Sequence, residues 1–214
     1  VKDVFVSKAD AENAPIRFAE QSGVIRSSAI SDNGHWVYDT TDYGTIEGEL
    51  GGVVQEKNTC TVLTAIRELL SLGYKITPQA VKTGFAQVTG LTGLMGRWQI
   101  IQRDPLIICD TGHNVGGWEY LSKQLDQTPC HALHIVIGMV NDKDIHGVLK
   151  LLPKKAIYYF TNASVERALP AEEFALQASE HGLKGTIHSS VALAIEAAKS
   201  AAEPNDCIFI GGST

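Results

Sequence analysis

Strand-like and helix-like segments alternate through the second half of the chain. Short runs rich in Val, Ile and Leu are separated by segments in which apolar residues recur every three or four positions. Such strands, separated by helices, are typical of a parallel sheet covered on both faces. The expected strands are 98–102, 105–110, 132–139, 156–160, 185–188 and 207–210, and the expected helices are 114–125, 142–152, 171–181 and 191–202. We therefore predict an α/β fold with a Rossmann-like, mostly parallel sheet over residues 93–214.

The first 92 residues have a less regular pattern. The expected strands are 4–6, 35–38 and 45–50, and the expected helices are 11–21, 57–72 and 77–88. Gly73 ends the second of these helices, and Thr77-Pro78 supplies the N-cap and first residue of the third. Residues 90–96 are glycine-rich and show neither helical nor strand periodicity. We therefore predict a linker there, between a domain of residues 1–92 and a domain of residues 93–214.

The composition and charge argue against two classes of binding partner, nucleic acids and membranes. The chain has 214 residues, of which 44% are hydrophobic, and a formal net charge of −6. Nucleic-acid binding depends on clustered Lys and Arg, and the sequence has no such cluster, so we expect no nucleic-acid partner. No apolar stretch reaches the ~20 residues that cross a bilayer, and no signal-peptide pattern opens the chain. We therefore expect no membrane partner.

The four cysteines favour a reducing compartment. They have neither the spacing of a zinc site nor the density of a disulfide scaffold. Cys60, Cys109 and Cys207 lie in apolar runs, where reduced and buried thiols are expected. We predict a cytoplasmic protein. The chain opens on Val1 rather than Met, which agrees with a chain cut from a longer one.

Polar residues and glycines follow the expected strands, where ligands of doubly wound sheets gather. These segments are 110–113, 138–144, 161–163 and 211–213. Asp110 ends an apolar strand and could accept hydrogen bonds from sugar hydroxyls, while Gly112 permits close backbone approach. The spacing does not match Gly-x-Gly-x-x-Gly, so an alternative stays open in which Asp110 only caps the next helix and His113 packs at the surface.

Two cations are further candidates. Asn141, Asp142 and Asp144 suit a helix start, but Lys143 in a first helical turn would oppose the helix dipole, so it is a candidate for contact with a substrate carboxylate or phosphate. Arg97 could set its planar donor fork against phosphate oxygens. The sequence has no Gly-x4-Gly-Lys-Ser/Thr loop to hold those phosphates. We therefore interpret the chain as half of an enzyme.

Several segments occur in the order of a known family. These are 50–58 (Leu-x-Gly-x-x-Gln-x-x-Asn), 96–99 (Gly-Arg-aromatic-Gln/Glu), 110–114 (Asp-x-Ala-His-Asn) and 138–145 (Gly-x-x-x-Asp-Lys-Asp), with weaker agreement at 167–170 and 211–213. The chain resembles the C-terminal half of folylpolyglutamate synthase and bifunctional dihydrofolate synthase, relatives of the Mur ligases. Gly112 replaces the usual Ala, Val115 the usual Pro and Val54 a common aromatic residue.

This resemblance implies an ATP-dependent ligase. A dihydropteroate or reduced folate carboxylate would be phosphorylated, and the amine of L-glutamate would attack the acyl phosphate. Asn58 would read the adenine, Asp110 would hold the ribose, and Arg97 would contact the phosphates and act in catalysis. His113 is a further catalytic candidate, and His113 and Lys143 are candidates for glutamate binding.

The resemblance also implies missing parts. Residues 1–92 would be the C-terminal part of a central ATP-binding domain, and 93–214 the C-terminal Mur ligase domain. The phosphate loop and the Mg²⁺ ligands are expected in an N-terminal half preceding Val1, so this chain itself would supply no metal ligand and would not turn over alone. A nucleotide shared by Asn58 and Asp110 would require closure of the two domains.

Three other interpretations remain at this stage. The first is a Mur ligase acting on a peptidoglycan precursor, the second a stand-alone nucleotide-binding module, and the third an NAD-dependent oxidoreductase, which the absence of Gly-x-Gly-x-x-Gly disfavours. The sequence does not separate dihydrofolate synthase from folylpolyglutamate synthase activity.

Overall fold

The computed structural model of this chain describes residues 1–162 and 165–212. Its contacts divide the chain into two compact units: Val1–Glu49 with Val54–Leu91, and Leu50–Val53 with Thr92–Thr214. The segment Leu50–Val53 therefore belongs with the second unit, although its neighbours on both sides belong to the first. Each unit has its own sheet and its own apolar core.

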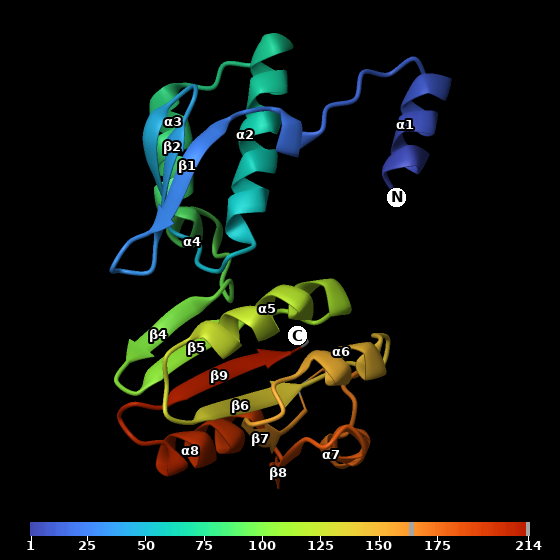
Figure 1. The fold of residues 1–214 in the computed structure, drawn as a ribbon, viewed down its shortest axis with the longest axis vertical. Coiled ribbons are helices and arrows are strands. Elements are labelled where there is room, and N and C mark those ends of the chain that lie inside the picture. The colour runs from blue at the N-terminus through green and yellow to red at the C-terminus, as the bar shows by residue number, and fades with distance from the viewer. Residues whose placement is uncertain (163–164, 213–214) are drawn as a thin grey trace. The chain divides into compact units, whose positions relative to one another are not determined.

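The first unit is built on a three-stranded antiparallel sheet in the order β1-β2-β3 (Figure 1). Trp36, Tyr38 and Ile46 of β2 and β3 are buried in one cluster with Leu63 of α2 and Val81 of α3. The elements are α1 (Lys2–Ala11), a 3-10 helix (Ala19–Gln21), β1 (Ile25–Ile30), β2 (Trp36–Thr40), β3 (Gly44–Gly48), α2 (Gln55–Ser71), α3 (Pro78–Ala86) and α4 (Val88–Thr92). The expected strands near 35–38 and 45–50 and the helices near 57–72 and 77–88 are confirmed.

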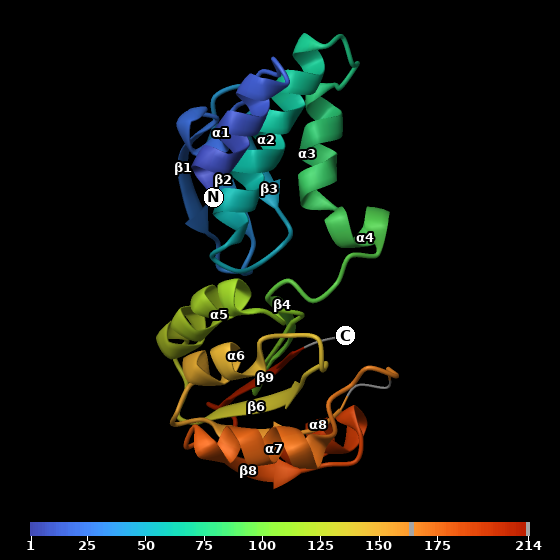
Figure 2. The same cartoon turned by 90° about the vertical axis from the view of Figure 1, so that its right-hand side faces the viewer.

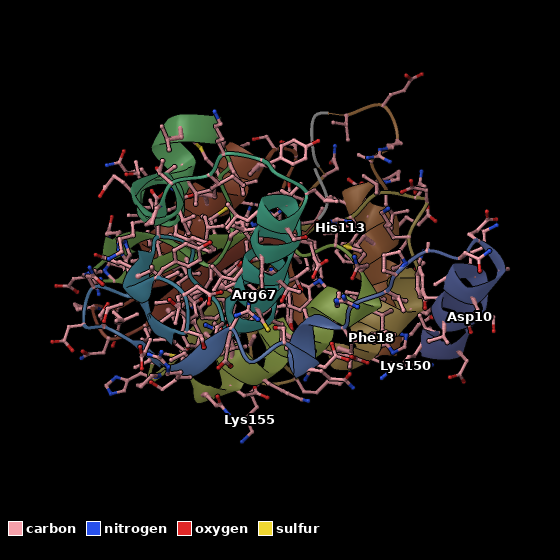
Figure 3. All side chains as sticks on the ribbon, turned by 90° about the horizontal axis from the view of Figure 1, so that it is seen from above. Asp10, Phe18, Arg67, His113, Lys150 and Lys155 are labelled. Carbon is pink, nitrogen blue, oxygen red and sulfur yellow. The ribbon has the colours of Figure 1, made fainter. Side chains whose placement is uncertain are left out.

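Polar contacts fix α2 against the loops of the first unit. Arg67, labelled in Figure 3, donates from Nη2 to Asp42 Oδ2 at 2.8 Å and from Nη1 to the Ser22 carbonyl at 2.9 Å. Ser22 precedes β1, and Asp42 lies between β2 and β3. These bonds therefore hold α2 against the segment before β1 and against the turn between β2 and β3.

The first 30 residues depart from the sequence expectation. Residues 4–6 belong to α1 rather than to a strand, and the expected helix 11–21 is absent except for its last turn. Asn13 has a φ of 49°, and Pro15 follows Ala14, so the chain leaves helical geometry directly after α1. Strand β1 was missed because its residues are mostly polar and exposed. Pairing with β2, which no local pattern shows, makes it a strand.

The second unit is a six-stranded sheet in the order β4-β5-β9-β6-β7-β8. Strand β4 runs antiparallel to β5, and every other pair is parallel. The elements are β4 (Gln99–Arg103), β5 (Leu106–Asp110), α5 (Val115–Gln127), β6 (Leu133–Gly138), α6 (Ile145–Leu151), β7 (Ile157–Phe160), α7 (Ala171–Glu180), β8 (Lys184–Ile187), α8 (Val191–Ala201) and β9 (Cys207–Gly212). The predicted α/β fold with a mostly parallel sheet is confirmed. Helix α4 reaches Thr92, so the expected linker at 90–96 is partly helical.

Alternate residues of the central strands face opposite layers of helices (Figure 2). Ile135 and Ile137 of β6 are buried in a cluster with residues of α5, α6 and α7. Val136, between them, is buried with Ala194 and Ala198 of α8. Both faces are therefore covered, as near-continuous apolar strands predicted.

The carboxyl ends of the central strands meet at one edge. Asp110 pairs with Gly211 and Gly138 with Gly212 across the sheet. Gly212 has a φ of 110°, and a Cβ there would lie 1.9 Å from the Gly138 carbonyl oxygen. Glycine is thus required where β9 and β6 end side by side. The predicted convergence of these loops is confirmed; Ala163 and Ser213, also named in it, lie outside the described residues.

The cysteines are free thiols. Cys207 is fully buried, and burial raises its pKa to about 12. Cys60 and Cys109, expected to be buried, are only partly buried: α2 leaves Cys60 at the edge of its packed face, and Cys109 lies at the end of β5. Across residues 1–162 and 165–212, every helix is too short or too polar to span a membrane.

Candidate functional site

Asp110 stands at the carboxyl end of β5 and organises the turn that follows. Its Oδ2 accepts a hydrogen bond from the Trp98 backbone N–H at 2.7 Å, and its Oδ1 accepts one from the Gly112 N–H at 2.8 Å. Partial burial raises the pKa of this carboxyl above its usual value, while the two backbone donors and the Arg97 charge act in the opposite direction. Asp110 is therefore not the cap of α5.

The segment carrying Arg97 is bound to the same turn. The Thr111 N–H donates to the Gly96 carbonyl at 3.0 Å, and the Gly96 N–H donates to Gln99 Oε1 at 3.1 Å. Arg97 Nη1 donates to the Gly96 carbonyl at 3.1 Å and to Thr111 Oγ1. Within the described part of the chain, no carboxylate oxygen lies within 4.0 Å of this guanidinium. The remaining donors of Arg97 are therefore available to an anion.

The backbone at this segment is unusual. Gly96 has a φ of 68°, and Trp98, a residue with a Cβ, has a φ of 48°. The Trp98 N–H is held by Asp110, and its ring is buried in the main core beside Phe209. Side-chain packing and the carboxylate thus hold a conformation that non-glycine residues rarely adopt. Gln99 belongs to the 96–99 motif, whereas the role of Thr111 and this φ carry no local sequence signal.

His113 has a defined tautomer in its neutral form. Its Nδ1 lies 2.9 Å from the Thr111 carbonyl oxygen, which can only accept, so Nδ1 carries the proton. Nε2 is then left with a lone pair. Asn114 caps α5 by accepting from the Gly117 N–H at 2.8 Å. Thr111 directly follows Asp110, and it accepts from Arg97 through Oγ1 and from His113 through its carbonyl oxygen.

Gly112, where the family has Ala, makes room for a core side chain. A Cβ at this position would lie 2.2 Å from Leu121 Cδ1 and 3.2 Å from Asp110 Oδ1. Leu121 of α5 is buried in the core beneath the turn. A side chain at position 112 would therefore require Leu121 to move.

Lys143 lies in the loop between β6 and α6. Helix α6 begins at Ile145, with Asp144 capping it by accepting from the Gly147 N–H at 2.8 Å. The prediction that Lys143 occupies the first helical turn was wrong, because the helix starts later than residue 142. Its Nζ is 4.0 Å from Asp142 Oδ2, which also accepts from Arg167 Nη1 at 2.8 Å. Lys143 is thus only loosely held.

Two of the motif segments meet beside this loop. The Asn141 N–H donates to the Arg167 carbonyl at 3.0 Å, and the Leu169 N–H donates to the Met139 carbonyl at 2.8 Å. Together with the Asp142–Arg167 ion pair, these bonds fasten residues 167–169 along the end of β6. The two segments are far apart in the sequence, so no local pattern predicts that they pair.

The remaining motif segment, residues 50–58, is divided between the two units. Asn58 lies on α2, is exposed, and donates from Nδ2 to Gln55 Oε1 at 3.0 Å. Leu50–Val53 belongs to the second unit, where the Val53 N–H donates to Gln124 Oε1 of α5 at 2.9 Å. A Cβ on Gly51 would lie 2.7 Å from the Trp98 carbonyl oxygen. The two glycines of the motif therefore allow this segment to pack on Trp98.

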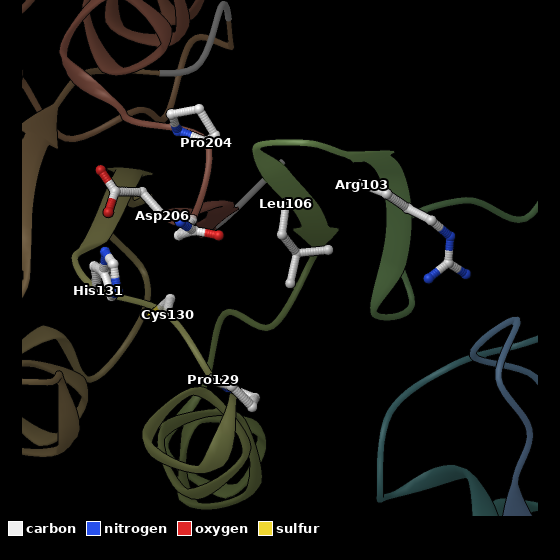
Figure 4. A pocket seen from close by; sticks show the side chains of 8 residues that line it. Arg103, Leu106, Pro129, Cys130, His131, Pro204 and Asp206 are labelled. Carbon is white, nitrogen blue, oxygen red and sulfur yellow. The ribbon is translucent and has the colours of Figure 1, made fainter.

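A pocket of about 710 Å³ lies at the opposite, amino end of the strands (Figure 4). Leu106, Cys130, His131 and Asp206 are among the residues that line it, and the Arg103 side chain points away from the others. Asp206 is already fully engaged by backbone N–H groups and His134. This pocket brings together no group aimed at a ligand, so we assign the candidate site to the carboxyl edge.

Comparison with known proteins identifies relatives of this chain. Residues 96–214 match the family described as Mur ligase, glutamate ligase domain. The dihydrofolate synthase/folylpolyglutamate synthase of Escherichia coli K12 is 33% identical over 187 residues, which are 83% of this chain and 42% of that protein. The chain thus spans less than half of that relative. This similarity agrees with the predicted resemblance and does not favour a peptidoglycan-precursor ligase.

Solved structures agree with this relationship. Escherichia coli FolC in complex with DHPP and ADP has a TM-score of 0.64 and 30% identity, over 87% of this chain and 42% of that one. A bifunctional folylpolyglutamate synthase/dihydrofolate synthase with Mn, AMPPNP and L-glutamate bound has a TM-score of 0.62 and 26% identity, over 86% of this chain and 42% of that one. By the match of its second unit to the glutamate ligase domain, this chain belongs to the Mur ligase family.

Proposed function

We propose that this chain is the C-terminal part of an ATP-dependent ligase that joins L-glutamate to dihydropteroate or a reduced folate through an acyl phosphate. The observation that carries the proposal is Arg97, a half-buried cation beside Asp110 that has no carboxylate oxygen within 4.0 Å among the described residues. The order of the motifs and the ligands named for the relatives support it. Residues 1–92 would be the end of the ATP-binding domain, and 93–214 the C-terminal domain.

The carboxyl edge fits a nucleotide. Each Asp110 oxygen accepts one backbone N–H and retains a lone pair, so ribose hydroxyls could donate to it. Arg97 would set its free donors on phosphate oxygens and stabilise the charge that moves during phosphoryl transfer. Asn58 would read the adenine with its amide group. Because Thr111 and Asp110 hold the arginine segment, Arg97 and Asp110 would be in place before the nucleotide binds.

Glutamate would bind near His113 and Lys143 in this proposal. The His113 Nε2 lone pair can accept a proton or a hydrogen bond from the attacking amine. Lys143 is only weakly paired with Asp142, which leaves its ammonium group able to approach a substrate carboxylate. Asp142 forms its shorter ion pair, at 2.8 Å, with Arg167 rather than with Lys143.

A protein-bound Mg²⁺ does not fit the residues present. Within the described ranges, no three His, Cys, Asp or Glu side chains are grouped so that they could hold a metal ion. The use of Mg²⁺ is part of our proposal, with ligands supplied by protein outside these 214 residues, together with the phosphate-binding loop.

Ligase activity should depend on the phosphate-binding loop and the Mg²⁺ ligands that we place outside these 214 residues. The 214-residue chain alone should release no ADP in response to glutamate, because phosphoryl transfer needs loop donors and a metal arranged around the phosphates. A chimera in which this chain replaces the matching segment of the Escherichia coli relative should show glutamate-dependent ADP release. Both are measured by a coupled ADP assay with pteroate and folate substrates.

The contrary results are also informative. A folded chimera that binds ATP yet ligates no amino acid to either substrate would contradict the proposed reaction. ATP binding to the isolated chain separates a half-site from a stand-alone module. A module should bind tightly and lose binding on Asp110→Ala or Asn58→Ala, whereas a half-site should bind weakly in every form.

A further inference from the structure

Two histidines lie together on the helical layer of the second unit. His146 Nδ1 and His181 Nε2 are 3.2 Å apart, and the ring centroids are 5.5 Å apart with an interplanar angle of 47°. His146 is on α6, and His181 directly follows α7. Neither has any other side-chain partner in the described part of the chain. No residue of the nucleotide site touches this pair.

We propose that His146 and His181 form a two-imidazole binding site for a divalent transition-metal ion such as Ni²⁺, Cu²⁺ or Zn²⁺. Imidazole nitrogens bind these ions at roughly 2.0–2.1 Å. Two such ligands would be separated by about 2.9 Å at a right angle and by about 3.4 Å at a tetrahedral angle. The observed 3.2 Å lies between these values, so little rearrangement is required.

Hydrogen bonds order the backbone that carries both histidines. The His181 N–H donates to the Ala178 carbonyl at 3.0 Å, and the Gly182 N–H donates to the Ser179 carbonyl at 2.9 Å, which closes the end of α7. His146 is the second residue of α6, whose first turn is capped by Asp144. Rigid ligand positions reduce the entropy lost when the metal binds.

The surroundings select the metal. No third His, Cys, Asp or Glu among the described residues completes the site, so water would fill the other positions. Mg²⁺ and Ca²⁺, which require oxygen ligands, would not bind. The site is therefore distinct from the Mg²⁺ requirement of the proposed ligase, and it stands whether or not that proposal is correct.

Some nearby charges oppose metal binding and others favour it. Lys154 donates to the His181 carbonyl at 2.5 Å and would repel a dication, as would the amino end of α6. The carboxyl end of α7 favours a cation. Lys154 is exposed, so salt screens its repulsion. Direct coordination by two neutral imidazoles is then the dominant interaction.

Calorimetric titration of the 214-residue chain, without a histidine tag, tests the site. At pH 7.5, Ni²⁺ or Zn²⁺ should bind at one saturable site and raise the thermal unfolding midpoint. His146→Gln and His181→Gln should each weaken binding by about tenfold or more, since loss of even an outer-shell partner costs that much. His131→Gln, which changes an exposed histidine elsewhere, should bind like the wild type.

Three results would overturn the proposal. One is the absence of saturable binding, which would leave the pair as a hydrogen bond only. Another is binding that survives both substitutions unchanged. The third is binding lost equally in His131→Gln. Unfolding midpoints of all variants without metal show that each remains folded.

Discussion

Replacing Arg97 with alanine should lower the glutamate-dependent turnover of the chimeric ligase by about 10²- to 10³-fold. The guanidinium is held by Gly96 and Thr111 and has no carboxylate oxygen within 4.0 Å among the described residues, so its charge is available to the phosphate that moves. Charge that develops in the transition state is stabilised most by donors already in place. Most of the loss should therefore be in kcat rather than in the KM for ATP, measured by steady-state ADP release.

Two variants make this test specific. Arg103→Ala removes an arginine from the other end of the β4–β5 hairpin and should leave turnover nearly unchanged. Arg97→Lys keeps the charge without the planar fork, so it should recover only part of the activity. A rise in KM alone for Arg97→Ala would mean that the residue binds nucleotide without assisting the transfer. Equal losses in Arg97→Ala and Arg103→Ala would indicate damage to the hairpin.

Most of the second unit could be predicted because its signals are local. Strands such as β6 are continuous apolar runs, and in the first unit the cap of α3, Thr77, is likewise visible as a single residue. Parallel pairing then places the ends of β5, β9 and β6 at one edge without further information. The candidate position of Asp110 follows from this topology alone.

Contacts between distant segments could not be predicted. The link from Val53 to Gln124 joins residues 71 apart in the sequence, and neither residue type marks it. Asp110 is a candidate ribose ligand by its position, but no local pattern predicts that its oxygens accept from the Trp98 and Gly112 N–H groups. Strand β1 depends on β2 for its conformation. In each case tertiary structure decides what local propensity leaves open.

A second large effect should come from Asp206, which joins the amino ends of β6 and β9. Its Oδ1 accepts from the Ala132 N–H at 2.9 Å, and its Oδ2 accepts from the Glu203 N–H at 2.8 Å. His134 Nε2 lies 3.3 Å from Oδ2, and His134 Nδ1 lies 3.0 Å from the Tyr159 hydroxyl. Asp206 and His134 are 5% and 2% exposed, so both side chains are largely shielded from bulk water.

Asp206→Ala should therefore lower the free energy of unfolding by about 3–5 kcal/mol, measured by urea denaturation at pH 7. The substitution leaves two backbone donors and one imidazole without an acceptor in a buried place. Asp142→Ala is the matched control, since it removes an exposed carboxylate paired with Arg167 and should cost at most about 1 kcal/mol. Similar losses in the two variants would mean that the buried network contributes no special stability.

The contribution of Asp206 should also vary with pH. Hydrogen bonds from the Glu203 and Ala132 N–H groups, together with His134, lower the pKa of this carboxyl, with burial opposing them. A carboxyl whose pKa is lower in the folded state binds fewer protons there, so it stabilises the fold above its unfolded pKa of about 3.9. The difference between wild type and Asp206→Asn should be constant above about pH 5 and should shrink as the pH falls below about 4. If it stayed undiminished in urea titrations at pH 3, the ionised carboxylate would not be the stabilising form.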